Sequence, residues 1–497
     1  MNRYISSRNR NDIVTAHQAI IKGLSNDGGL YTIENITAHI DPSEVLHLSY
    51  QQTAEKILSA MLDDFTEDEM HACVTGAYDE KFDTAEIVPL KQIQEGWLME
   101  LWHGPTCAFK DIALTILPHL LTTSIHKDDK KEIISILTAT SGDTGKAALE
   151  GFKNVPGTAI TVFYPEVGVS SIQKKQMATT TGRNVDVIAV KGNFDDCQRM
   201  IKQATSDPLV LSSLDGVSIS SANSINVGRL MPQIVYYYTS YAKLVESGAV
   251  ACGDPVNFVV PTGNFGDILA GYFAKLLGLP VNRLICASNT NNVLTDFLNT
   301  GTYSIHRTFT PTTSPSMDIL ISSNLERLLF MASGYDDDFV SEMMKNLQKK
   351  GSYSVPKEIM AKITATFAGC WTDEDTCRKT IHDLFENEHV LIDPHTAVAL
   401  AAKKKYEQET GDHTPSVILS TASPYKFTHD VLACIAGENM ADDFAAMERL
   451  HALSGVKIPP SLAALKDMDV RFTRSIEIED GMQVIADRMK EVGNVHD

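Results

Sequence analysis

The chain has 497 residues, of which 43% are hydrophobic and 21% are charged, a composition typical of a globular protein with a well-buried core. A chain of this length is expected to form about two to four domains or subdomains. Its formal net charge of −20 argues against nonspecific nucleic-acid binding, because such proteins present a basic face. An anionic small substrate is not excluded, since a local cationic pocket can lie inside an acidic protein.

The eight cysteines are scattered along the chain and contain no C-x-x-C pair. Their spacing matches no zinc template, so no metal site is expected. Scattered cysteines favour a reducing, cytoplasmic setting. The first residues show no apolar signal-peptide segment, and no run of about 18 apolar residues predicts a membrane span. We therefore expect a cytoplasmic protein whose partners include neither a membrane nor nucleic acid.

Residues 1–92 are expected to form a helical N-terminal domain. Apolar residues at helical spacing predict helices at 16–23, 43–65 and 67–82. The sequence Asp-Gly-Gly-Leu-Tyr at 27–31 predicts a turn that leads into a short strand.

From about residue 95 the predicted strands and helices alternate, a pattern typical of an α/β fold with a mostly parallel sheet. The expected strands are 97–102, 133–138, 159–164, 185–190, 256–260, 284–288 and 417–421. The expected helices are 111–122, 145–152, 170–180, 194–204, 230–246, 268–277 and 427–435.

The alternation falls into two blocks, which predict two lobes with a cleft between them. Within a core of 93–440, the smaller lobe is expected at about 125–210 and the larger lobe comprises the remainder. For 300–380 the sequence predicts only a loop at 308–316 and a helix at 338–349. The C-terminal segment 441–497 is expected to pack on the larger lobe, with one strand and a final helix at 482–492.

Lys110 lies in an apolar context after a Gly104-Pro105 turn, within the sequence His-Gly-Pro-Thr-Cys-Ala-Phe-Lys-Asp at 103–111. Desolvation lowers the pKa of a lysine, and the neutral amine is the form that makes a Schiff base with an aldehyde. An ordinary surface lysine at the start of a helix explains this stretch equally well.

Two glycine-containing loops, 138–145 and 261–267, each follow a predicted strand and open a helix. Backbone N–H groups at such a junction bind anions, assisted by the helix dipole. The first loop is not a Walker A sequence, because Thr140 and Ala147 stand where that template needs glycine and Ser or Thr. In the second loop Gly263 and Gly266 allow the backbone to approach a phosphate. The alternative is that both loops are ordinary strand-to-helix turns. Because the chain also contains the candidate Schiff-base residue Lys110, the two loops together favour a phosphorylated aldehyde cofactor and an anionic substrate.

Ser420 and Thr421 lie at the end of a predicted strand, where ligands bind in open α/β sheets. A hydroxyl there could contact a ring nitrogen, although a helix N-cap is the more common role.

The segment 221–229 places polar groups directly before an apolar helix. They could bind a substrate phosphate, with an arginine as the charged fork; a capped helix with a solvated arginine is the alternative. The candidates are Asn223, Ser224, Asn226 and Arg229. The polar run 173–176 is a weaker candidate, whose lysines fit a solvated helix face better.

Six motifs in chain order resemble those of threonine synthases, in the longer branch found in many bacteria and fungi. They are DGGLY at 27–31, HGPTCAFKD at 103–111, SGDTG at 141–145, GNFGD at 263–267, DPHTA at 393–397 and STA at 420–422. The resemblance therefore covers nearly the whole chain. It implies an α/β, two-lobed enzyme of fold-type II, as in the β subunit of tryptophan synthase, with open, mostly parallel sheets, a helical N-terminal domain and pyridoxal 5'-phosphate as cofactor.

The resemblance also implies roles for single residues. Lys110 would carry the cofactor as an internal aldimine, and Thr421, or less favourably Ser420, would contact the pyridine nitrogen. The cofactor phosphate would bind to backbone amides of Gly263, Asn264, Phe265, Gly266 and Asp267. The substrate carboxylate would bind to Ser141, Gly142, Asp143, Thr144 and Gly145. Asp143 stands where the wider fold-type II group often has asparagine, so its contact with the cofactor or the substrate is left open. Cys107 is interpreted as a packing residue.

The implied reaction is that of a carbon–oxygen lyase acting on phosphates (EC 4.2.3.1). It converts O-phospho-L-homoserine and water to L-threonine and phosphate, the last step of threonine biosynthesis. Three alternatives stay open: a phospho-lyase that releases 2-oxobutyrate, a Ser/Thr dehydratase, and a cofactor-binding homologue without activity. The sequence does not decide between a monomer and a homodimer.

Overall fold

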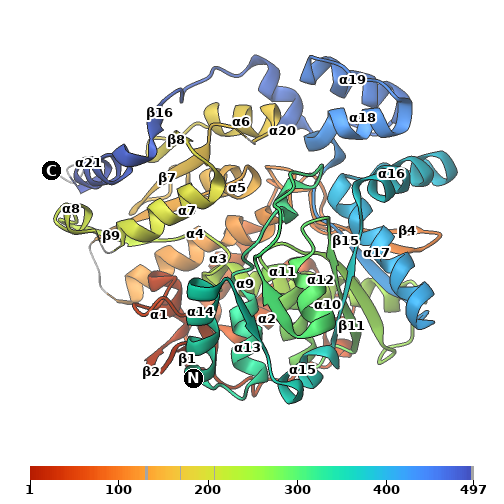
Figure 1. The fold of residues 1–497 in the computed structure, drawn as a ribbon, viewed down its shortest axis with the longest axis horizontal. Helices are drawn as coiled ribbons and strands as arrows, with labels where there is room; N and C mark the ends of the chain where they lie inside the picture. Colours follow the sequence, from red (N-terminus) through yellow and green to blue (C-terminus); the bar gives the residue numbers. More distant parts are fainter. Residues whose placement is uncertain (129–131, 168, 206, 494–497) are drawn as a thin grey trace.

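Two largely parallel β-sheets, each flanked by helices, organise the molecule (Figure 1). The computed structural model describes residues 1–128, 132–167, 169–205 and 207–493. The larger sheet has the strand order β14-β11-β10-β15-β5-β4, in which β4 runs antiparallel to β5 and the other neighbours are parallel. The smaller sheet has the order β16-β8-β7-β6-β9 with all neighbours parallel. The predicted α/β fold with two lobes is confirmed.

The strand bounds follow the two sheets. In the larger sheet they are β4 Leu90–Ile93, β5 Gly96–Glu100, β10 Val256–Pro261, β11 Val281–Ser288, β14 Phe367–Trp371 and β15 Ser416–Ser420. In the smaller sheet they are β6 Ile133–Ala139, β7 Thr158–Pro165, β8 Val185–Lys191, β9 Val217–Ser220 and β16 Ser475–Glu477. Every residue of β6, β7, β10 and β15 is buried, because parallel sheets are covered by helices on both faces. This explains why continuous apolar runs marked these strands in the sequence.

The helices alternate with these strands or follow them. They are α1 Ala16–Lys22, α2 Tyr50–Met61, α3 Glu67–Ala77, α4 Lys110–Lys127, α5 Asp143–Phe152, α6 Ser171–Ala178, α7 Phe194–Ala204, α8 Pro208–Leu211, α9 Val227–Leu230, α10 Ile234–Glu246, α11 Gly266–Leu276, α12 Val293–Thr300, α13 Leu325–Ala332, α14 Asp337–Lys350, α15 Lys357–Thr364, α16 Glu374–Glu388, α17 Pro394–Thr410, α18 Thr428–Ala436, α19 Asp443–Ser454, α20 Pro460–Ala463 and α21 Gly481–Gly493. Short 3-10 turns are η1 Pro42–Val45, η2 Met231–Gln233, η3 Pro315–Met317, η4 Pro424–Phe427, η5 Ala464–Asp467 and η6 Ile478–Asp480. Among the residues described, no helix combines the length and apolar composition needed to cross a membrane.

The N-terminal region contains a small antiparallel sheet besides its helices. This sheet has the order β2-β1-β3, with β1 Tyr4–Ser6, β2 Asn9–Val14 and β3 Tyr31–Ile33. The expected boundary at 92/93 falls inside β4, which pairs with β5 of the larger sheet. The helix expected over 43–65 begins only at Tyr50, because Ser49 and Gln52 form a capping box that starts a new helix there.

In the two large sheets the strands β4, β9 and β14 were not predicted from the sequence, nor were β1 and β2 of the N-terminal sheet or most of the elements of the insertion 300–380. β4, β9 and β14 are short edge strands, and short strands carry little periodic signal. The insertion adds the two-stranded sheet of β12 Thr302–Ser304 and β13 Ser352–Ser354. The loop expected at 308–316 carries the turn η3, and the predicted helix at 338–349 is confirmed as α14.

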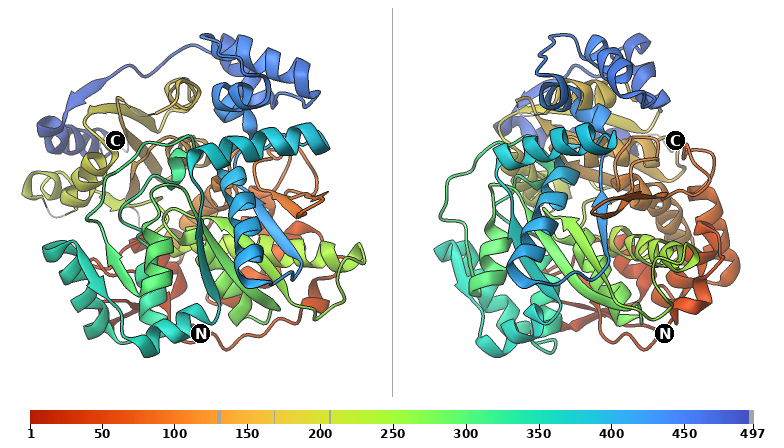
Figure 2. Two further views of the ribbon diagram at one scale, coloured as in Figure 1. Left: turned by 45° about the vertical axis from the view of Figure 1, so that its right-hand side comes forward. Right: turned by 90° about the vertical axis from the view of Figure 1, so that its right-hand side faces the viewer.

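The C-terminal segment belongs to both lobes, so the expectation that 441–497 packs on the larger lobe alone is wrong. Met447, Leu450 and Leu465 pack in the core cluster that includes β15 and α17. The chain then crosses the molecule (Figures 1 and 2), β16 pairs with β8, and α21 packs against α7 and α8. Ile485 and Met489 are fully buried in the core of the smaller lobe.

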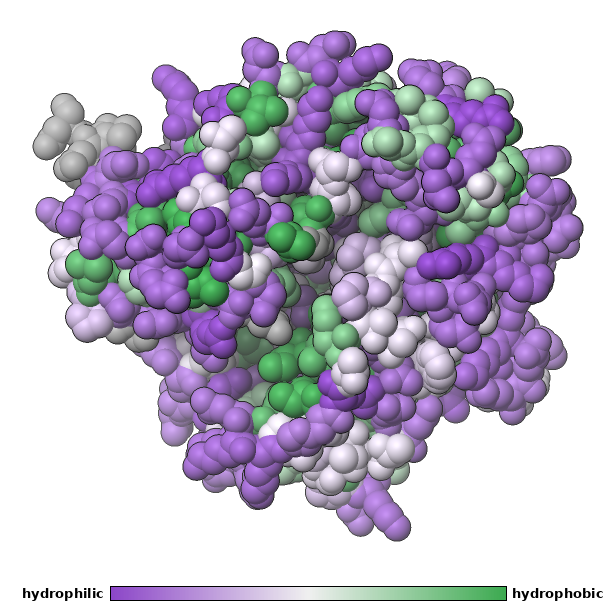
Figure 3. Space-filling view, turned by 45° about the horizontal axis from the view of Figure 1, so that its top comes forward, coloured by the Kyte–Doolittle hydropathy of each residue, from purple (hydrophilic) through white to green (hydrophobic). Residues whose placement is uncertain are grey.

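The face shown in Figure 3 is mainly hydrophilic at its rim, with hydrophobic and neutral residues gathered near its middle.

Candidate active site

Three loops meet where neighbouring strands of the larger sheet end. Strand β5 leads to Lys110, β15 ends beside Thr421, and β10 leads into the loop Gly263–Asp267. The backbone N–H of Phe109 donates to the Thr421 carbonyl at 2.8 Å, which places Lys110 next to the end of β15. This is the carboxyl edge at which open α/β sheets bind ligands.

A tight turn sets the position of Lys110 at the first residue of α4. The backbone N–H and hydroxyl of Thr106 donate to the Asp111 carboxylate at 2.8 and 2.6 Å. Cys107 adopts a φ of 61°, a left-handed conformation that marks a constrained turn. A Cβ on Gly104 would lie 2.5 Å from the Cβ of Asp111. Gly104 is therefore required by the close approach of the turn to the helix.

The Lys110 side chain is enclosed, with 12% of it exposed. Its Nζ lies 3.5 Å from Oδ2 of Asp143 and 4.6 Å from the ring centre of Phe109. Burial lowers the pKa of Lys110; Asp143 raises it, and the cations Lys426 and Arg229 lower it further. A lysine with a lowered pKa has more of the neutral amine that attacks a carbonyl. The interpretation as an ordinary surface lysine is therefore wrong.

Asp143 is a buried carboxylate between two lysines. Its Oδ1 lies 2.6 Å from Nζ of Lys426 and accepts a hydrogen bond from Gln173 at 2.7 Å. Burial alone would raise its pKa, but Lys426 and Lys110 bring the pKa well below the usual range. Asp143 is thus ionised beside the reactive amine.

The loop Gly263–Asp267 presents unpaired backbone donors. Within the described parts of the chain, the backbone N–H groups of these five residues meet no acceptor. Phe265 has a φ of 61°, which turns the chain so that the loop runs into the N-terminus of α11. Unpaired N–H groups at the N-terminus of a helix favour an anion. The loop therefore fits a phosphate group.

The hydroxyl groups of Ser420 and Thr421 differ in their hydrogen bonding. Ser420 Oγ accepts hydrogen bonds from Trp102 Nε1 at 3.2 Å and from Thr396 Oγ1 at 3.1 Å. The Thr421 hydroxyl has no hydrogen-bond partner among the described residues. Thr421 is thus the hydroxyl available to a ring nitrogen.

The loop Ser141–Gly145 approaches Lys110 from the smaller lobe through Asp143. Thr140 Oγ1 accepts hydrogen bonds from the N–H groups of Gly142 and Gly145, both at 2.9 Å. Gly142 has a φ of 142°, and a Cβ there would lie 2.4 Å from the Gln173 side chain. Ser141 and Thr144 stay partly exposed, as a carboxylate-binding role requires.

Arg229 is buried, which contradicts the interpretation as a solvated arginine. One terminal nitrogen donates to the Ala222 carbonyl at 3.0 Å, whereas Nε has no partner. Burial lowers its pKa to about 10. Oδ1 of Asn223 is also buried without a partner, and as an acceptor it would need a donor group on the ligand. A buried cation without a carboxylate is costly, so this corner fits an anionic ligand.

Ser224 and Asn226 have different roles. Ser224 lies beside a candidate ligand-binding loop, whereas Asn226 stabilises the backbone. The Cβ of Ser224 would lie 3.7 Å from a Cβ on Gly266, so Ser224 faces the second glycine loop. Asn226 donates to the Ile20 and Ser221 carbonyls and accepts from the Gly228 N–H. All its polar atoms are engaged, so Asn226 is corrected from a phosphate ligand to the N-cap of α9.

Lys426, Ser316 and His395 were not predicted as functional residues from the sequence, but the fold brings them to this site. Lys426 is enclosed by Tyr425 and Phe427 in the sequence, the same apolar signal that singled out Lys110. Ser316 Oγ donates to Asp143 Oδ2 at 3.4 Å, and its backbone N–H donates to His395 Nε2 at 3.2 Å. No local pattern marked Ser316, because its contacts depend on the insertion folding back. In the weak candidate patch 173–176, the glutamines face inward and Lys174 is exposed.

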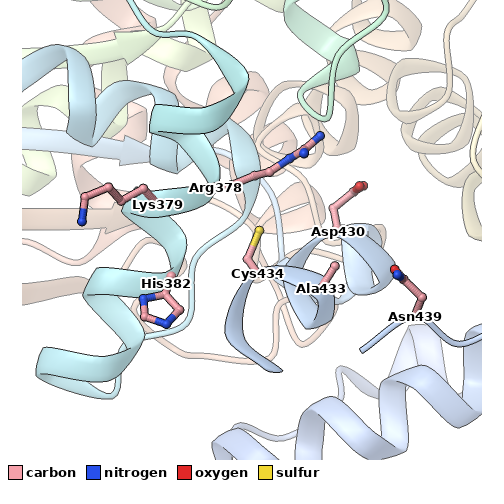
Figure 4. Close-up of a pocket in the computed structure, with 7 residues that line it drawn as sticks. All are labelled: Arg378, Lys379, His382, Asp430, Ala433, Cys434 and Asn439. Carbon is pink, nitrogen blue, oxygen red and sulfur yellow. The ribbon is translucent and has the colours of Figure 1, made fainter. Parts of the chain in front are cut away.

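A separate pocket of about 520 Å³ lies between α16 and α18 (Figure 4). Its lining residues are Arg378, Lys379, His382, Asp430, Ala433, Cys434 and Asn439. Arg378 and Lys379 are largely exposed and have carboxylates on their own helix within 3.9 and 2.7 Å. None of the lining residues belongs to the Lys110 cluster, and the two cations that line the pocket are largely exposed.

A buried lysine beside an anion-binding loop at the edge of a parallel sheet is the arrangement of a Schiff-base enzyme. A family model described as "Pyridoxal-phosphate dependent enzyme" matches residues 85–422, which shows that class. The models "Threonine synthase N terminus" and "Threonine synthase, C-terminal" match 3–78 and 396–485.

Individual relatives agree with these models. Threonine synthase of Pseudomonas aeruginosa is 36% identical over 91% of this chain and 95% of its own length. The human protein "Threonine synthase-like 1" is 36% identical over 84% of the chain, which spans 58% of that relative's length. The structure of PLP-bound threonine synthase from Brucella melitensis aligns with a TM-score of 0.87 at 32% identity, over 99% of this chain and all of that one. The chain belongs to the threonine synthase family.

Proposed function

We propose that this protein is a threonine synthase, which forms L-threonine and phosphate from O-phospho-L-homoserine and water. The proposal is carried by two groups of candidate anion-binding residues near one buried lysine. The N–H groups of Gly263–Asp267 form one group, and the buried Arg229, whose Nε–H has no partner, is the centre of the other. A phosphorylated cofactor and a phosphorylated substrate together require two such sites.

The residues present fit pyridoxal phosphate, the cofactor of this family. Lys110 would bond to its aldehyde, the loop Gly263–Asp267 would hold its phosphate, and the Thr421 hydroxyl would contact the ring nitrogen. When bound, the cofactor acts as an electron sink that stabilises carbanions. A hydroxyl partner leaves the ring nitrogen free of the proton that a carboxylate would hold there.

The chain's own residues supply binding and proton transfer. The Lys110 amine accepts the substrate proton at Cα and returns protons at later steps, since it lies at the centre of the cluster. Ser141, Thr144 and their loop bind the substrate carboxylate. Arg229, Asn223 and Ser224 bind the phosphate that leaves. Burial of the cluster excludes bulk water and prevents protonation at the wrong carbon.

The first test is a product assay with O-phospho-L-homoserine, in which phosphate is followed and the organic products are separated. Threonine equal to the phosphate released supports the proposal. Phosphate with 2-oxobutyrate would establish a phospho-lyase instead. Turnover of unphosphorylated serine or threonine alone would establish a dehydratase, and loss of all turnover in a protein that binds cofactor would indicate a homologue without activity.

Lys110→Ala tests the residue assignment. We expect a folded protein that loses turnover by about three orders of magnitude or more, because the amine is the proton carrier. Lys127→Ala, at the other end of α4 and paired with Glu69, is the matched control and should keep normal turnover. Full activity in Lys110→Ala would remove Lys110 from the mechanism.

We also infer a cytoplasmic location, which is consistent with eight free cysteines among the described residues. Cell fractionation with an antibody tests it, and recovery in a membrane or secreted fraction would contradict it. Size-exclusion chromatography with light scattering distinguishes a monomer from a homodimer.

A further inference from the structure

Lys426 is a buried cation that the proposed reaction does not use. Its side chain is fully buried on η4. Its Nζ lies 2.6 Å from Oδ1 of Asp143 and donates to the Thr106 carbonyl at 2.9 Å. Burying an ammonium group is costly unless it is paired, so this position is held for a specific partner.

That partner is shared with the reactive lysine. One oxygen of Asp143 faces Lys426 and the other faces Lys110, at 2.6 and 3.5 Å. Gln173 and Ser316 complete the hydrogen bonds of the carboxylate. Two cations therefore compete for one buried anion, and the closer contact belongs to Lys426.

We propose that Lys426 is a positioning residue, which fixes the Asp143 carboxylate as an anion and so leaves the Lys110 amine in its neutral, reactive form. If Lys110 is neutral, the Asp143–Lys426 pair is electrically balanced. If Lys426 were absent, Asp143 would pair with Lys110 alone and hold it as an ammonium group. The proposal rests on the assignment of Lys110 made above and adds a residue to it.

The charges around Lys110 agree with this arrangement. Burial lowers the pKa of Lys110, Asp143 raises it, and Lys426 and Arg229 lower it. Asp267 on α11 is a further carboxylate that senses the charge of Lys110. On α4 itself, Asp111 is engaged by Thr106. Removal of Lys426 takes away one of the two cations that oppose Asp143 and therefore raises the pKa of Lys110.

The experiment measures the pH dependence of Lys110 labelling in the full-length protein freed of cofactor with hydroxylamine. Acetic anhydride is the probe, and mass spectrometry quantifies the Lys110 peptide. In Lys426→Met the midpoint should rise by about one pH unit, so that labelling below the midpoint becomes about tenfold slower. Lys426→Arg should keep the normal midpoint.

Lys403→Met is the matched control, because Lys403 is also buried and paired with carboxylates but lies on α17. Its Lys110 midpoint should equal that of the unmodified protein. An unchanged or lowered midpoint in Lys426→Met would overturn the proposal.

A thermal-unfolding cycle covers the case in which Lys426→Met folds poorly. Without Lys426, the buried Asp143 carboxylate keeps only the longer contact of 3.5 Å with Lys110 in place of 2.6 Å, whereas the double variant buries no carboxylate at this position. The double variant Asp143→Asn/Lys426→Met should therefore unfold at a higher temperature than Lys426→Met. A double variant that is no more stable would contradict the proposal. Neither readout depends on turnover, so failure of the proposed reaction is recognised separately by the product assay.

Discussion

Gly263 and Gly266 lie in one loop but meet different surroundings. A Cβ on Gly263 would lie 2.5 Å from the backbone carbonyl oxygen of Ser316. A Cβ on Gly266 would lie 3.4 Å from the Asn324 side chain, an ordinary contact distance. The sequence motif treats both glycines alike, whereas the insertion 300–380 makes only the first of them sterically indispensable.

We therefore predict that Gly263→Ala weakens the retention of pyridoxal phosphate by about tenfold or more, because the loop must move away from the Ser316 carbonyl. Gly266→Ala, whose Cβ would meet no protein atom closer than 3.4 Å, is the matched comparison and should lose less cofactor than Gly263→Ala. Equilibrium dialysis measures both. Equal losses in the two variants would contradict the assigned packing.

Asp267 gives a pH-dependent prediction at the same scale. Its Oδ1 accepts hydrogen bonds from Tyr236 and Tyr237, and its Oδ2 is buried without a partner. Burial raises its pKa from 3.8 to about 6, against the opposing effect of the tyrosines and of Lys110. Because the folded pKa exceeds the unfolded one, the stability that this group contributes is complete below about pH 4 and is lost as pH rises through 6.

Asp267→Asn removes this dependence. The stability of the unmodified protein relative to the variant should fall by about 1–3 kcal/mol between pH 4 and 7. Differential scanning calorimetry of the two cofactor-free proteins across this range measures it. Asp111, whose pKa burial also raises to about 6, is present in both proteins and cancels in the comparison. If the stability of the two proteins changes with pH in the same way, the pKa of Asp267 is not raised.

At the scale of elements, the helix that carries Lys110 packs closely on α5. A Cβ on Gly151 of α5 would lie 2.0 Å from the Leu114 carbonyl oxygen of α4. The two helices approach each other at backbone distance, and one of them begins at Lys110 while the other begins at Asp143. The contact between α4 and α5 therefore sets the distance between Lys110 and Asp143.

Gly151→Ala should separate α4 from α5 and lower stability by about 1–3 kcal/mol. Because Lys110 and Asp143 begin these helices, we also expect weaker cofactor retention. Thermal unfolding and dialysis measure the two effects. A variant with unchanged melting temperature would show that the helices tolerate separation at this point.

At the scale of the whole molecule, the C-terminal segment joins the two lobes. α19 lies against α18 of the larger lobe, and β16 and α21 complete the sheet and core of the smaller lobe. The crossing is visible in both figures of the fold. The smaller lobe therefore depends on residues far from it in the sequence.

Ile485→Ala should destabilise the smaller lobe by about 2–5 kcal/mol, because Ile485 is fully buried in its core. Gln483→Ala, an exposed position on the same helix, is the control and should change stability little. Hydrogen exchange resolves the effect, with faster exchange expected in β6 to β8. Uniform exchange throughout both lobes would contradict a local role for α21.

The sequence by itself determined the alternating α/β fold, Lys110 and the two glycine loops, because each depends on residues close together in the chain. Apolar runs marked the buried strands, and the turn before Lys110 is held by Thr106 and Asp111. The tertiary structure alone decided that Lys426 pairs with Asp143, that Asn226 caps a helix and that β16 joins the smaller sheet. These contacts join distant segments, and local periodicity carries no information about which distant partner a buried charge or an edge strand will meet.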